Sequence, residues 1–151
     1  MGEEGKNIAA KNIATLLVES SSNKSWLINS RLGERGYTSV RRVMEWEDVM
    51  PHVINHQPQL ILIGARVQKR EGHEPEGQKY RRGYEACREI KGRFPGIAII
   101  GMDERSNSDS EKMWTERYGA DGFMSYGTAT LQPETLDTLI QDVLRKYQPS
   151  T

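Results

Sequence analysis

The sequence predicts a single α/β domain in which one parallel β-sheet is covered by helices on both faces. Short apolar runs of strand length alternate five times with segments of helical periodicity, an order typical of parallel sheets with right-handed crossovers. Most of these runs are apolar on both strand faces, as expected for strands that are buried from both sides. A chain of 151 residues is long enough to build one such domain around a sizeable core.

The first predicted strand, residues 13–18, is followed by a polar cluster rich in serine. Serine and asparagine are favoured helix N-caps, so we expect a helix over residues 23–35. Its inner face should hold Trp26, Leu27 and Leu32, with Ile28 beside them. Gly36 can adopt the positive φ that commonly ends a helix.

The second strand is predicted at 37–43, where apolar and polar residues alternate. Proline is tolerated only in the first turn of a helix, so Pro51 places the start of the second helix near Asp48. The third strand, 58–64, is strongly apolar and stops at Gly64.

The segment 65–83 has almost no apolar residues and is predicted to be a long, solvated loop. A helix is predicted at 84–94, followed by the fourth strand at 95–102. The next helix, 111–119, should end at Gly119.

The fifth strand is predicted at 120–126 and a loop at 127–135, before a strongly amphipathic helix at 136–147. Residues 1–12 are polar and are expected to form a flexible leader, and 148–151 a tail.

The composition excludes several classes of protein. Lys plus Arg and Asp plus Glu number 21 each, so no overall field would attract nucleic acid or an anionic membrane. No apolar run approaches the ~20 residues of a membrane span. The single cysteine, Cys87, can form no disulfide within the chain, which favours a reduced, cytoplasmic protein.

Four phrases of the sequence together resemble the receiver domain of two-component response regulators, a bacterial signalling family. They are "LLVESS", "QPQLILIG", "GYEACREIKGRFPGIAII" and "YGADGFMSYG". The resemblance covers residues 13–147 and implies the flavodoxin-like, CheY-like (βα)₅ fold with strand order 2-1-3-4-5. It also implies that 65–83 carries an insertion of roughly ten residues, longer than most loops in compact domains.

Matched position by position, this resemblance implies a degenerate phosphorylation pocket. The phosphoacceptor aspartate falls on Gly64, and the acidic pair that holds Mg²⁺ falls on Glu19 and Ser20. The Thr/Ser position falls on Asp103 and the lysine position on Tyr126. Glycine has no side chain to phosphorylate, so we expect a pseudo-receiver that has no catalytic residue and is not an enzyme.

We expect no metal and no cofactor, because two monodentate acids without a third ligand bind Mg²⁺ poorly. Glu19 and Asp103 could form a weak cation site or be plain solvated carboxylates. Asp103 could instead accept hydrogen bonds from the loop 20–22 and act as a structural plug. The start of the helix after "ESSS" could also hold an anion, although such sequences are usually only caps.

Two surfaces are expected to bind a partner. The first is the inserted loop, with Lys69, Arg70, Tyr80, Arg81 and Arg82. The second is the face formed by the fourth helix, fifth strand and fifth helix, where receivers dock or dimerise, with Trp114, Tyr118 and Phe123. The alternatives are a mobile solvated loop and an aromatic pair that packs in the core.

The function expected from these features is phosphorylation-independent signalling through contact with a protein, including a homodimer through the second surface. A membrane partner is not expected, and nucleic acid is disfavoured because glutamates dilute the basic residues of the loop. The first alternative is a small-molecule or anion sensor that uses the vacated pocket. A conventional phosphorelay receiver is the least favoured interpretation.

Overall fold

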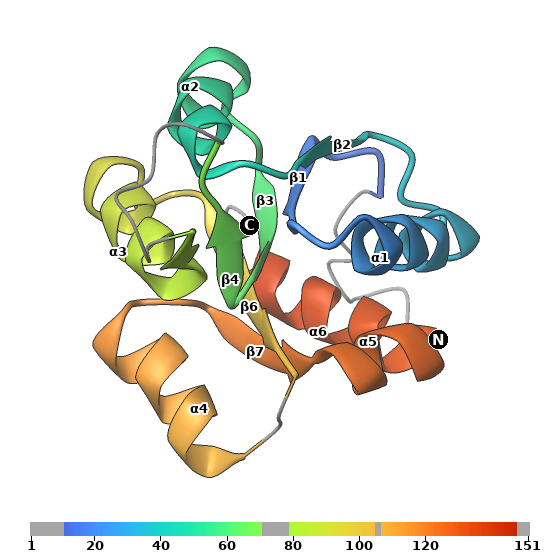
Figure 1. The fold of residues 1–151 in the computed structure, drawn as a ribbon. Coiled ribbons are helices and arrows are strands. Elements are labelled where there is room, and N and C mark those ends of the chain that lie inside the picture. The colour runs from blue at the N-terminus through green and yellow to red at the C-terminus, as the bar shows by residue number, and fades with distance from the viewer. Residues whose placement is uncertain (1–10, 71–78, 105–106, 148–151) are drawn as a thin grey trace.

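The computed structural model describes residues 11–70, 79–104 and 107–147. The main sheet has five parallel strands in the order β2-β1-β3-β6-β7. Counted along the chain, this is the order 2-1-3-4-5, so the predicted doubly wound, CheY-like fold is confirmed. Figure 1 shows helices on both sides of this sheet.

The strands of the sheet are β1 (Thr15–Val18), β2 (Val40–Val43), β3 (Leu60–Gly64), β6 (Ala98–Asp103) and β7 (Gly122–Ser125). A separate antiparallel ribbon consists of β4 (Arg66–Gln68) and β5 (Tyr80–Arg82). The helices are α1 (Ser22–Glu34), α2 (Trp46–His56), α3 (Gly83–Arg93), α4 (Ser108–Lys112), the π-helix η2 (Met113–Arg117), α5 (Tyr126–Leu131) and α6 (Pro133–Arg145).

The core consists of two apolar clusters, one on each face of the sheet. On one face, α1 and α6 contribute fully buried side chains such as Ile28 and Ile140. On the other face, α2, α3 and η2 contribute Val53, Ile90 and Trp114. The central strands are buried along their whole length, which explains their continuous apolar sequences.

The prediction for the inner face of α1 was wrong at one position. Trp26 is 63% exposed, whereas Ser25, Ile28 and Leu32 are buried. Spacings of three and four residues place those three side chains on one face of a helix with 3.6 residues per turn. Trp26 is one residue away from Ser25, so it is turned by about 100° out of the core.

Helix α2 begins at Trp46, two residues before the predicted Asp48, and Pro51 lies inside it. A proline there removes one backbone hydrogen bond of the helix. Val49 and Val53 are buried on its inner face. Burial of this face therefore stabilises the helix in spite of the proline.

The predicted loop at 127–135 was also wrong, because α5 begins directly after β7. Ser125 caps this helix, since its Oγ accepts a hydrogen bond of 3.1 Å from the Thr128 backbone N–H. The last helix then begins at Pro133, three residues earlier than predicted, with proline in its first turn.

The segment 65–83 is not simply a solvated loop, because β4 and β5 pair within it. Val67 is fully buried and packs with the α2–α3 side of the core. Ser20 holds this ribbon beside the sheet: its Oγ donates to the Met44 carbonyl (2.7 Å) and accepts from the Gln68 N–H (2.6 Å). Residues 71–78, between the two strands, lie outside the described residues, as do 1–10 of the predicted leader and the tail 148–151.

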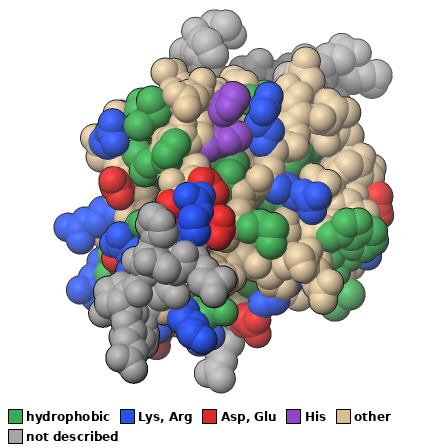
Figure 2. Space-filling view, turned by 45° about the horizontal axis from the view of Figure 1, so that its top comes forward, with side chains coloured by type: hydrophobic (Ala, Val, Ile, Leu, Met, Phe, Trp, Pro, Cys, Tyr) green, Lys and Arg blue, Asp and Glu red, His purple; other side chains and the backbone are tan. Residues whose placement is uncertain are grey.

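Figure 2 shows a face on which acidic and basic side chains are interspersed. The two histidines of α2, His52 and His56, have ring centroids 4.4 Å apart. Within the part of the chain that the structure describes, no helix has the length and apolar character needed to cross a bilayer.

Candidate functional site

The carboxyl ends of the central strands meet at one edge of the sheet, around a hollow of about 430 Å³. Ligand sites of open parallel sheets lie at this edge. The hollow is lined by Glu19, Lys24, Ala65, Arg66, Arg82, Asp103, Glu104 and Tyr126. The structure thus brings together Glu19, Asp103 and Tyr126 of the predicted degenerate pocket.

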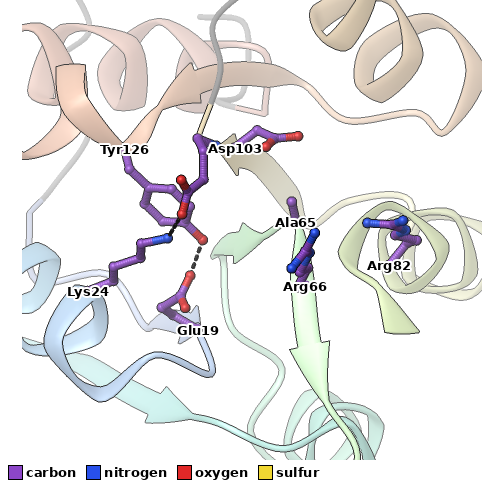
Figure 3. A pocket seen from close by; sticks show the side chains of 8 residues that line it. Glu19, Lys24, Ala65, Arg66, Arg82, Asp103 and Tyr126 are labelled. Atoms are coloured by element: carbon purple, nitrogen blue, oxygen red, sulfur yellow. Dashed lines mark hydrogen bonds and ion pairs between the residues drawn. The ribbon is translucent and has the colours of Figure 1, made fainter. Parts of the chain in front are cut away.

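A tyrosine–glutamate pair, Tyr126 and Glu19, fills the space directly over Gly64. Figure 3 shows these two side chains pointing toward each other. The Tyr126 hydroxyl donates a hydrogen bond to Glu19 Oε1. A Cβ atom built on Gly64 would lie 2.1 Å from the Tyr126 Oη and 2.4 Å from Glu19 Oε1. The position where the resemblance places a phosphoacceptor is therefore occupied by side chains from two other strand ends.

Burial controls the ionisation of this pair. Glu19 is only 4% exposed, and burial raises the pKa of its carboxyl group. The hydrogen bonds from the Tyr126 hydroxyl and from the Ser21 backbone N–H (2.7 Å to Oε2) oppose this effect in part. Burial, together with the neighbouring Glu19 charge, also raises the pKa of Tyr126, so its hydroxyl remains a donor at neutral pH.

Replacing Tyr126 by phenylalanine should make stability more dependent on pH. Because the folded-state pKa of Glu19 is raised, the folded protein holds more protons than the unfolded chain just above pH 4.5. Stability therefore falls as pH rises through this window. Without the Tyr126 donor, the pKa of Glu19 rises further, because its ionised form loses a hydrogen bond. We therefore expect Tyr126→Phe to lower the free energy of unfolding by about 1–3 kcal/mol near pH 7 and by less near pH 4.

Urea denaturation of the wild type and Tyr126→Phe at both pH values measures this difference. Tyr80→Phe is the matched control, because Tyr80 is 51% exposed. An equal loss at the two pH values would show that the hydroxyl does not support the ionised Glu19.

Ser20 and Asp103 occupy the two other positions of the predicted pocket. The alternative of a structural plug, in which Asp103 accepts from the loop 20–22, is not found among the hydrogen bonds of the described residues. Ser20 binds the ribbon, as described above, and is not among the residues that line the hollow. Asp103 Oδ1 accepts a hydrogen bond from the adjacent Glu104 N–H (2.7 Å). Glu19, not Asp103, accepts the hydrogen bond from the 20–22 loop, at Ser21.

Sequence reasoning missed Lys24 and Glu104, which close one side of the hollow. Lys24 Nζ forms an ion pair with Glu104 and lies 4.4 Å from the centre of the Tyr126 ring. This ion pair lowers the pKa of Glu104. The two residues are 80 positions apart. Lys24 lies in the first turn of α1 and Glu104 directly follows β6, so only the folded sheet brings them together.

The five residues that were expected to bind a partner through the inserted loop divide into two groups. Arg70 pairs with Glu45 (3.3 Å) and Asp48 (2.6 Å), and Arg81 pairs with Glu85 (2.8 Å). The Arg81 guanidinium also covers the Trp46 ring at 4.1 Å. These two arginines bind the ribbon to α2 and α3. The second group is Lys69, which is half-buried, and Tyr80 and Arg82, which are exposed.

The aromatic residues expected on the second partner surface lie mostly inward. Trp114 is fully buried, so the expectation that it faces a partner was wrong. The π-helical turn, in which the Tyr118 N–H reaches the Met113 carbonyl (3.1 Å), positions the indole against Gly101. Tyr118 packs on Tyr84 with ring centroids 4.2 Å apart, and Phe123 is half-buried.

The solved structures that superpose on this chain include receiver domains. The BeF3-activated N-terminal receiver domain of Klebsiella pneumoniae RstA superposes with a TM-score of 0.70 at 18% identity, over 87% of this chain and 98% of that chain. A CheY-like receiver domain protein from Methanospirillum hungatei JF-1 gives a TM-score of 0.69 at 16% identity, over 89% of this chain and 95% of that chain.

NtrX from Brucella abortus gives a TM-score of 0.71 at 16% identity; the match covers 89% of this chain but 27% of that chain. The present chain therefore matches only part of the longer regulator. A scan against protein-family models found no match, and a search of curated proteins found none either. At identities of 16–18%, the structural likeness establishes the fold.

Proposed function

We propose that this chain is a signalling module with a receiver fold that takes no phosphoryl group at position 64 and acts by contact with a protein partner. The proposal rests on the tyrosine–glutamate pair over Gly64. Glycine offers no acceptor atom, and the nearby volume is filled by Tyr126 and Glu19. The likeness to receiver domains supports a role in signal transduction.

The proposal has two further parts. The module works without Mg²⁺, because one position of the acidic pair that would bind this ion is Ser20. We also propose that it uses no other cofactor and has no enzymatic activity of its own. We propose a cytoplasmic location, because Cys87 is the only cysteine of the sequence and can form no disulfide within the chain. Burial raises the pKa of this lone thiol to about 12, which makes it an inert core group.

Intact mass spectrometry after incubation with acetyl phosphate and Mg²⁺ tests the loss of phosphoryl transfer. We expect no gain of one phosphoryl group by the wild type. A Gly64→Asp/Tyr126→Lys double variant restores the two residue types at the positions that the resemblance assigns, and is the informative comparison. An adduct on the wild type that peptide mapping places within residues 60–68 would overturn the proposal.

We propose that the partner binds the face formed by β7 and α6. A shallow groove of about 350 Å³ lies there, lined by Phe123, Met124, Glu134, Thr135, Thr138, Leu139 and Asp142. Phe123 and Leu139 are partly buried against the core. Because Trp114 is buried, it cannot contribute to an interface. The groove is the part of this face where apolar side chains still line an open surface. A second copy of the chain is the simplest partner for such a surface.

Size-exclusion chromatography with light scattering measures self-association of the wild type and a Thr138→Arg variant. Thr138 is exposed and lines the groove, so the arginine should block docking without disturbing the core. We expect a concentration-dependent dimer that Thr138→Arg abolishes. Thr38→Arg is the control, because Thr38 is exposed just before β2 and does not line the groove. A wild type that is monomeric at every concentration would exclude the homodimer and leave a different protein as the partner.

A further inference from the structure

We infer that the hollow at the carboxyl edge of the sheet binds a small phosphate monoester between Arg66 and Arg82. This inference rests on the proposed function, because the hollow is free for a ligand only when position 64 carries no phosphoryl group. The ligand would be held without covalent attachment, above the tyrosine–glutamate pair.

The ribbon places two positive charges directly opposite each other. Arg66 and Arg82 are cross-strand partners in the antiparallel pairing of β4 and β5, so they share one face of the ribbon. The other face carries Val67, which is buried. Like charges at directly opposed positions are destabilising. An anion bound between them would remove this repulsion.

Both arginines line the hollow, and Figure 3 shows them on the side opposite Lys24 and Glu19. The other two arginines of the ribbon region, Arg70 and Arg81, have carboxylate partners on α2 and α3. For Arg66 and Arg82, the described residues provide no hydrogen bond or ion pair; Arg66 only lies close enough to Glu104 to help lower the pKa of that carboxyl group.

The charge of the site indicates the class of ligand. Two guanidinium groups match the two negative charges and the planar oxygen pairs of a phosphate monoester. Lys24 is already paired with Glu104, so it adds little to the attraction. Asp103 also lines the hollow and can accept a hydrogen bond from a hydroxyl or ammonium group of the ligand. A phosphate monoester that carries a hydrogen-bond donor at its other end therefore fits both the two arginines and the Asp103 carboxylate.

Isothermal titration of the full chain with O-phosphoethanolamine, and with inorganic phosphate as the second probe, tests this inference. We expect saturable binding of both probes, tighter for O-phosphoethanolamine because its ammonium group can reach Asp103. Arg66→Gln and Arg82→Gln should each weaken binding about tenfold or more, since each removes a charge-assisted hydrogen bond. Circular dichroism establishes that both variants are folded.

Arg42→Gln is the matched control, because Arg42 is exposed on β2, an edge strand away from the hollow. Binding that is absent for both probes, unchanged in both arginine variants, or weakened equally by Arg42→Gln would overturn the inference. The mass-spectrometric test separates this result from the proposed function. If neither probe binds and no adduct forms, only the inferred phosphate-monoester site is refuted. If an adduct forms at position 64, both this site and the proposed function are refuted.

Discussion

A Trp114→Ala variant is expected to lose about 3–5 kcal/mol of unfolding free energy, the range found when a buried tryptophan is truncated. Trp114 is fully buried among α3, β6 and β7. Its ring lies so close to the backbone of β6 that a Cβ on Gly101 would be 2.3 Å from Cε3. Truncation would leave a cavity that neighbouring strands cannot close, and denaturant unfolding measures the loss.

Trp26→Ala is the control for this prediction. Trp26 is 63% exposed on α1, and surface substitutions usually change stability by less than about 0.5 kcal/mol. If Trp114→Ala left stability unchanged but altered the oligomeric state, the tryptophan would act at an interface and its burial in the core would be refuted.

A Gly64→Ala variant is expected to lower stability by about 1–3 kcal/mol, the usual cost of overpacking a buried site. The added methyl group would meet Tyr126 Oη at 2.1 Å and Glu19 Oε1 at 2.4 Å. These oxygens form a buried hydrogen bond, so the added methyl group either clashes with them or pushes them apart and breaks the bond. Thermal and urea denaturation measure the loss.

A double-mutant cycle identifies the cause. Tyr126→Phe removes the nearest clashing oxygen, so Gly64→Ala should cost less in that background, and the two losses should not add. Gly92→Ala is the matched glycine control: Gly92 lies within α3 and has no atom within 4 Å of an added Cβ. This change should be neutral or stabilising. Additive losses at positions 64 and 126 would show that the two residues do not compete for the same space.

The pattern of apolar runs in the sequence predicted the parallel sheet, and the resemblance to receiver domains implied its strand order and the lack of an acceptor at position 64. Buried central strands need side chains that are apolar on both faces, and this requirement leaves continuous runs such as 60–63 in the sequence. Element boundaries were less reliable. Pro51 was expected near a helix start but lies inside α2, and Ser125 unexpectedly caps α5. Burial against the rest of the protein decides whether such a helix forms, and the local sequence pattern indicates this burial only approximately.

The tertiary structure alone decided what replaces the acceptor and which aromatic residues remain outside the core. Glu19 and Tyr126 are 107 positions apart and form one hydrogen bond, and Arg66 meets Arg82 only because the inserted segment pairs with itself. Trp114 turned inward because a π-helical turn and Gly101 together make room for its ring. Sequence periodicity reports the face on which a residue lies, but the neighbours at that face come from distant segments. Packing between those segments therefore determined the chemistry of this site.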